Sequence, residues 1–153
     1  MDAYDKAIKL LSIREHTEKE IRQKLKERGC SARDIDEAVE RIKAEGSLSE
    51  ERFAASFLRS RLRKNPEGKS ILRMRLKEKG SPRDVSEAAL NEIWENEDYV
   101  RPLSIALDSL IRKKGREGAF AALLRKGWKD SEIRQALSLL DSDISECERI
   151  HIE

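Results

Sequence analysis

The feature that most constrains the fold of this chain is an internal repeat. Residues 25–29 read Leu-Lys-Glu-Arg-Gly, residues 76–80 repeat them as Leu-Lys-Glu-Lys-Gly, and residues 124–127 keep a looser copy, Leu-Arg-Lys-Gly. The first two copies lie 51 positions apart, and the residues flanking them agree as well. Self-similarity with a period of roughly 20–50 residues is typical of proteins built from stacked supersecondary units. We therefore expect three small units in a row rather than one large domain.

Each unit is predicted to consist of amphipathic helices that end at glycine. Thr17 followed by Glu20 is a capping-box pattern, which starts a helix, and Gly29 stands where that helix is expected to end. Ser31 or Asp34 can cap the next helix. No useful stretch alternates apolar and polar residues with the period of two that a strand requires. The predicted fold class is therefore all-α, with tandem repeats of three-helix units that form an elongated, curved arc.

The unit boundaries are placed at turn signals between the helical patterns. In the third unit the pattern is weaker: Pro102 is expected in a first turn or at a kink, and residues 115–118 (Gly-Arg-Glu-Gly) are expected to form a turn. The predicted organisation is repeat 1 at residues 1–47, repeat 2 at 48–96, a degenerate repeat 3 at 97–142 and an acidic tail at 143–153.

Charge is abundant and unevenly distributed. Charged residues make up 41% and aromatic residues 5% of the 153 residues, which argues against one large core, while 38% hydrophobic residues at regular spacing argue against disorder. The net charge is only +2, but residues 52–79 carry ten basic and two acidic residues, and residues 141–153 carry five acids and one arginine. This asymmetry predicts an anionic partner for the middle repeat.

Several classes of protein are excluded by what the chain lacks. Cys30 and Cys147 are far apart without a CxxC spacing, and His16 and His151 do not cluster with them, so we expect a reducing, cytoplasmic compartment and neither a metal nor a cofactor. No apolar run approaches the ~20 residues of a membrane span, and the acidic residues 1–5 do not resemble a secretion signal. We expect a soluble protein.

No pattern for catalysis is present. The chain contains no GxGxxG, GxxxxGK[ST], GxSxG or HExxH motif. His16 stands beside acids at a helix junction, where a histidine is expected to be a cap or a surface residue. The chain is therefore predicted not to be an enzyme and to have no small-molecule substrate.

Basic side chains form stripes on the predicted helices of the middle repeat. On a helical wheel, Arg52, Arg59 and Arg63 lie opposite the phenylalanines of the same helix, and a second stripe follows at i, i+4 and i+8, echoed in the first repeat. Such rows can bind phosphates or carboxylates, although a highly charged chain also has stripes that are merely solvated. The candidate partner-binding residues are Arg52, Arg59, Arg63, Lys69, Arg73 and Lys77, with Arg22 and Lys26 next.

Two other groups of side chains are expected to have structural roles. The helical wheel places Arg61 in the middle of an apolar face, so we expect it to pair with a carboxylate or to extend along a neighbouring helix. The aromatic residues near unit ends can stack on bases. We nevertheless expect them to pack between units; they are Tyr4, Trp94, Tyr99 and Trp128.

Two stretches of the sequence resemble the motifs of a known family. Residues 14–21 (Arg-Glu-His-Thr-Glu-Lys-Glu-Ile), with Gly29, are similar to the opening motif of the RecX recombination regulators. Residues 46–54 (Gly-Ser-Leu-Ser-Glu-Glu-Arg-Phe-Ala), with Gly80, resemble their central motif. The likeness covers roughly residues 3–140. It departs from the family pattern at Ser49, where an acid is usual, and in the turn at residues 65–68, where Gly-x-Gly is common.

The resemblance implies tandem three-helix repeats and a specific partner. Proteins of this family bind the RecA recombinase polymerised on single-stranded DNA, in the helical groove of the filament. They lower its ATP hydrolysis, strand exchange and co-protease activities. Some members also contact DNA directly.

Two other functional classes stay open. The first is a sequence-nonspecific DNA-binding helical-repeat protein, with the helix expected over residues 81–95 entering a groove. That helix carries three glutamates and one arginine, which suits base reading poorly. The second is a helical scaffold for another protein.

Overall fold

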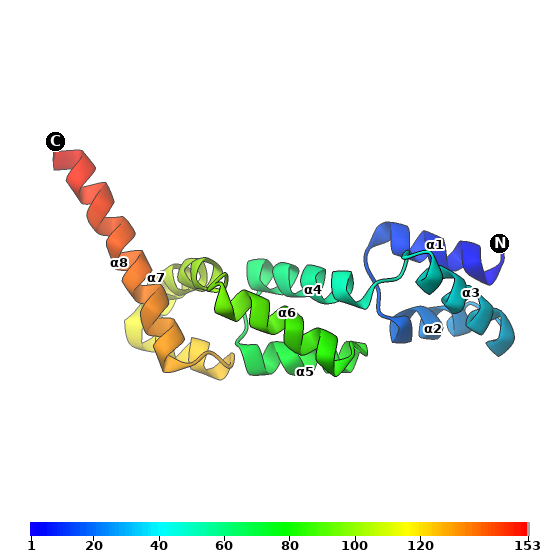
Figure 1. Cartoon of the computed structure of the whole chain (residues 1–153). Coiled ribbons are helices and arrows are strands. Elements are labelled where there is room, and N and C mark those ends of the chain that lie inside the picture. The colour runs from blue at the N-terminus through cyan, green and yellow to red at the C-terminus, as the bar shows by residue number, and fades with distance from the viewer. Residues whose placement is uncertain (153) are drawn as a thin grey trace. The chain divides into compact units, whose positions relative to one another are not determined.

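The computed structural model is all-α (Figure 1). It describes residues 1–152, with side chains through Asp143, and no strand occurs in that part of the chain. The side chains of the predicted acidic tail beyond Asp143 lie outside the described residues. The helices are α1 (Ala3–Ile13), α2 (Glu18–Glu27), α3 (Ala32–Ala44), α4 (Glu50–Lys64), α5 (Lys69–Lys79), α6 (Arg83–Glu95), α7 (Val100–Arg125) and α8 (Asp130–Ile152). None of them combines the length and apolar character that crossing a membrane requires.

Side-chain caps mark the starts of α2, α3 and α4. The predicted capping box is confirmed at α2, where Thr17 Oγ1 accepts from the backbone N–H of Glu20 and the Glu20 carboxylate accepts from the N–H of Thr17. Ser31, rather than Asp34, caps α3. Ser49 Oγ accepts from the Arg52 N–H at 3.2 Å, so the serine that departs from the family pattern still caps α4.

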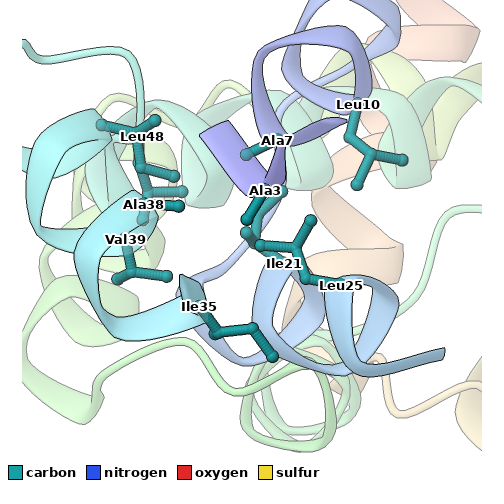
Figure 2. Close-up of a cluster of buried hydrophobic side chains, with 10 residues drawn as sticks. Ala3, Ala7, Leu10, Ile21, Leu25, Ile35, Ala38, Val39 and Leu48 are labelled. Atoms are coloured by element: carbon teal, nitrogen blue, oxygen red, sulfur yellow. The ribbon is translucent and has the colours of Figure 1, made fainter. Parts of the chain in front are cut away.

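The helices α1, α2 and α3 enclose a small aliphatic core. Figure 2 shows side chains from the three helices turned toward a common interior. In α3 the buried residues are Ile35, Ala38, Val39 and Ile42, which recur at helical spacing. The buried cluster consists of Ala3, Ala7, Leu10, Ile21, Leu25, Ile35, Ala38, Val39, Ile42 and Leu48.

Residues 97–142, predicted to be a degenerate third repeat, contain three helical segments. Helix α7 is interrupted at Gly115, whose φ of 79° and ψ of 173° are not helical. This angle falls in the region that favours glycine. The turn predicted at residues 115–118 is wrong beyond Gly115, because residues 116–118 are helical. Residues 100–114, residues 116–125 and α8 therefore form the three segments, with Pro102 in the first turn of α7 as predicted.

The chain divides into two compact units that share the helices of the middle repeat. The first unit contains residues 1–58 and 73–89, and the second contains residues 59–72 and the chain from Leu90 onward. The division passes through α4, α5 and α6. Each unit therefore includes a junction between consecutive repeats.

In the first unit, the end of α5 contacts the start of α2. Thr17 Oγ1 donates to the carbonyl of Lys79 at 2.6 Å. The next residue, Gly80, lies directly against Lys19: a Cβ added to this glycine would be 2.6 Å from Lys19 Cβ. The glycine of the second repeat is thus the contact point with the first.

In the second unit, the end of α7 meets the start of α5 in the same way. The N–H of Gly68 donates to the carbonyl of Lys126 at 2.9 Å. A Cβ added to Gly127 would lie 2.5 Å from Ile71 Cγ1, and one added to Gly68 would lie 2.0 Å from the Gly127 oxygen. Trp128 Nε1 donates to the carbonyl of Pro66 at 3.3 Å and closes the junction.

His16 is buried, with a side-chain environment that differs from the cap or surface position predicted for it. It is 1% exposed. Its Nδ1 lies 2.9 Å from the Arg14 carbonyl and its Nε2 lies 3.0 Å from Lys24 Nζ. Since the ammonium of Lys24 can only donate, Nε2 accepts and Nδ1 carries the proton in this network. Burial lowers the pKa of the His16 imidazole, so the neutral form is favoured.

The repeated glycine provides a matched test of the junctions. Gly29 and Gly127 have similar φ values, 83° and 88°, but a Cβ on Gly29 meets nothing within 4 Å. We expect Gly29→Ala to lower the free energy of unfolding by about 1–2 kcal/mol through backbone strain. Gly127→Ala should lower it by a further ~1–3 kcal/mol through overpacking against Ile71. Equal losses in urea unfolding would contradict a junction at Gly127.

The burial of His16 predicts a pH dependence of stability. The pKa of His16 is lowered in the folded chain. As the pH falls below the ordinary histidine pKa of about 6.5, the imidazole is therefore protonated in the unfolded chain before it is protonated in the folded chain. The free energy of unfolding is then expected to decrease by up to about 1.4 kcal/mol per pH unit between pH 6.5 and 5. His16→Gln is expected to have a flatter profile in urea unfolding over this range, and parallel profiles would refute this assignment.

Candidate cationic interface

Three of the predicted binding residues are ion-paired within the chain. Arg22 Nη1 lies 2.6 Å from Asp36 Oδ1, which ties α2 to α3. Arg52 Nε lies 3.0 Å from Glu15 Oε1, and Arg73 Nη2 donates to Glu87 Oε2 at 3.2 Å. These arginines therefore contribute to the packing of the first unit, although their side chains remain partly exposed.

Further interactions of Arg52 and Arg73 show what each arginine does in the fold. Arg52 Nη2 also donates to the carbonyls of Gly46 and Ser47, at 2.7 and 3.1 Å, and so holds the connection between α3 and α4. The hydrogen bond to Glu87 raises the pKa of the Arg73 guanidinium, which stays charged. Both arginines can reach a ligand only with the part of the guanidinium that these bonds leave available.

The remaining predicted residues are less constrained. Arg59, Arg63, Lys77 and Lys26 are exposed, and none of them forms an ion pair with another described residue. Lys69 is intermediate: its Nζ donates to Asn91 Oδ1 at 2.8 Å and lies 5.9 Å from the centre of the Trp94 ring. The free cations belong to α2, α4 and α5.

A polar groove in the first unit brings Lys77 together with a cation that the sequence analysis missed. It has a volume of about 430 Å³. Arg83, at the start of α6, is exposed and has no ion pair among the described residues. The Ser-x-Arg-Asp pattern shared by residues 31–34 and 81–84 was the available signal. The lining residues are Arg73, Lys77, Ser81, Arg83, Ser86 and Glu87.

A second groove of about 430 Å³ lies in the other unit, between α4, α6 and α7. Arg59 and Arg63 line it together with Arg101, which lies outside the predicted charge stripes. Its remaining lining is mostly aliphatic. These residues are Leu62, Ile93, Asp98, Pro102 and Ile105.

The expectation for Arg61 is confirmed. Its Nε lies 3.0 Å from an oxygen of Glu67, which is 5% exposed, and the Arg61 side chain is 29% exposed. The pair joins the end of α4 to the turn before α5. One of the two acids in the basic segment is therefore used internally and does not screen the exposed cations.

Three of the four aromatic residues pack between repeats, as predicted. The ring centroids of Trp94 and Tyr99 are 5.1 Å apart, and Trp128 lies 5.9 Å from each of them. Tyr99 and Trp128 are buried. The prediction is wrong for Tyr4, which stays within the first repeat: the Arg41 guanidinium lies 3.6 Å from its ring centre.

Comparison with protein families matches two consecutive segments of the chain. Residues 3–41 match the model described as RecX, first three-helix domain, and residues 49–90 match RecX, second three-helix domain. A protein of Prosthecochloris aestuarii named regulatory protein RecX is 37% identical over 143 residues, covering 90% of this chain and 93% of that protein. A protein of the same name from Chlorobium phaeobacteroides is also 37% identical, over 88% and 91% of the two chains.

A solved structure extends the comparison of the fold. The crystal structure of RecX from Lactobacillus salivarius aligns with a TM-score of 0.72 at 20% sequence identity. The alignment covers 91% of this chain and 94% of the other. The tandem three-helix architecture is thus shared across most of the length.

The Arg61–Glu67 pair predicts unequal effects of removing a carboxylate. We expect Glu67→Gln to lower the free energy of unfolding by about 1–3 kcal/mol, because it leaves a partly buried guanidinium without its counter-charge. Glu37→Gln is the control, since the Arg33–Glu37 pair is exposed and is expected to contribute less than about 1 kcal/mol. Thermal unfolding that separates the two variants by less than 0.5 °C would contradict this role, since ~1 kcal/mol corresponds to several degrees.

Proposed function

The chain belongs to the RecX family of regulatory proteins, and from this premise we propose that it regulates the RecA recombinase. In this proposal it binds the filament of RecA on single-stranded DNA, in the helical groove of the filament. It thereby inhibits or modulates ATP hydrolysis, strand exchange and co-protease activity. The action is through binding rather than catalysis, and it takes place in the cytoplasm.

The observation that carries this proposal is the set of unpaired cations in the middle repeat. A nucleoprotein filament presents phosphates and carboxylates, both of which bind guanidinium and ammonium groups. Arg59, Arg63 and Lys77 are exposed and lack ion pairs among the described residues, so binding does not require an internal pair to break. They are the primary contacts in this proposal.

The other candidate residues have secondary roles in the proposal. Lys26 is free but isolated on α2, and Lys69 already has Asn91 as a partner. Arg22, Arg52 and Arg73 hold neighbouring helices through their carboxylate partners. Their replacement would change both folding and binding, which makes them poor probes of the interface.

Direct, sequence-nonspecific DNA binding is the second candidate function. The polar groove that contains Lys77 and Arg83 favours it, since ammonium and guanidinium groups suit phosphate oxygens. Binding of this kind would fall steeply with salt on bare single-stranded DNA, with no recombinase present.

Charge reversal of the free cations tests the proposal. We expect the triple variant Arg59→Glu, Arg63→Glu, Lys77→Glu to weaken inhibition of RecA ATP hydrolysis on single-stranded DNA at least about tenfold, because like charges now face the filament. The triple variant Lys9→Glu, Lys113→Glu, Arg125→Glu is the matched control. It changes the net charge equally at exposed positions that have no ion pair among the described residues.

The outcomes separate the two candidate functions. Equal inhibition by the site variant and the wild type, with helicity retained in circular dichroism, would overturn the site assignment. Equal loss in both variants would indicate a general charge effect. Tight binding to bare DNA without any effect on the recombinase would favour the DNA-binding function.

A further inference from the structure

We infer that the groove between α4, α6 and α7 binds a segment of a partner protein in which an aliphatic side chain is flanked by carboxylates. The inference rests on the proposed function, in which that partner is the recombinase of the filament. It assigns Arg59 and Arg63 to protein contacts and so goes beyond a general attraction to anions.

Half of the lining of the groove is aliphatic. Leu62 comes from α4 and Ile93 from α6, and Pro102 and Ile105 come from the first turns of α7. Ile105 is 66% exposed, so its aliphatic surface is accessible to a ligand. A volume of about 430 Å³ is within the range of small binding clefts and has room for a few inserted side chains.

The rim of the groove is positively charged. Arg59, Arg63 and Arg101 are exposed, and none of them forms an ion pair within the described part of the chain. Asp98 is the only acid in the lining. Three guanidinium groups against one carboxylate favour an acidic ligand, and their planar forks suit bidentate contacts with carboxylates.

The chemistry of the lining favours a protein over a nucleic acid. Proteins that hold single-stranded nucleic acid offer aromatic side chains on which bases stack. The lining contains no aromatic residue, and the aromatic cluster of this unit is packed between repeats. The polar groove is lined by charged and serine side chains, whereas the α4–α6–α7 groove has aliphatic side chains against which a protein side chain can pack.

The test removes the apolar contact without changing charge. Ile105→Gln is expected to weaken co-sedimentation with RecA–single-stranded DNA filaments about tenfold, the loss typical of one buried aliphatic contact. Binding to bare single-stranded DNA is expected to stay within twofold. Ile13→Gln is the matched control, because Ile13 is 75% exposed at the end of α1 and lies outside the groove. Circular dichroism melting verifies that both variants fold.

Photo-crosslinking identifies what occupies the groove. With p-benzoylphenylalanine in place of Ile105, we expect a covalent product with the recombinase polypeptide. A product with DNA, or no product while the wild type binds filaments, would overturn the inference and leave the proposed function standing. Wild-type protein that neither binds filaments nor inhibits them would overturn the proposed function, and the groove assignment with it.

Discussion

The structure depends on a contact that is made twice, between the end of one helix and the start of another in the preceding repeat. In both junctions, the carbonyl that precedes a glycine accepts a hydrogen bond from the residue just before the earlier helix. Thr17 Oγ1 donates to the Lys79 carbonyl in one junction, and the Gly68 N–H donates to the Lys126 carbonyl in the other. The glycines then allow the close approach. Because a three-helix repeat has a small core, such nearest-neighbour contacts are needed for stability.

The internal ion pairs determine which basic residues are available to a ligand. Charge counting in residues 52–79 suggests a uniformly cationic segment, but Arg52, Arg61 and Arg73 hold carboxylates of other segments. When an arginine that holds an internal carboxylate binds a ligand, the internal contact is weakened. Arg59, Arg63 and Lys77 form no ion pair within the described part of the chain, so their binding to a ligand breaks no such contact. Fewer cations are therefore available to a ligand than the composition indicates. This favours regulation through a few defined contacts.

The two grooves with basic walls differ in the remainder of their surface. One has hydroxyl groups beside Lys77 and Arg83, and the other has aliphatic side chains beside Arg59, Arg63 and Arg101. Under the proposed function, the filament of protein on DNA offers phosphates to one groove and acidic polypeptide to the other.

The sequence by itself determined the helices, their caps and stops, and the need of Arg61 for an acid, because these follow from spacing along one helix. It also identified the repeat and the family. The tertiary structure decided which cations are free, since Arg52 meets Glu15 and Arg73 meets Glu87 only when separate helices pack. The burial of His16 and the α4–α6–α7 groove likewise required packing. Contacts between distant segments depend on how helices are placed against one another, and local periodicity does not encode that placement.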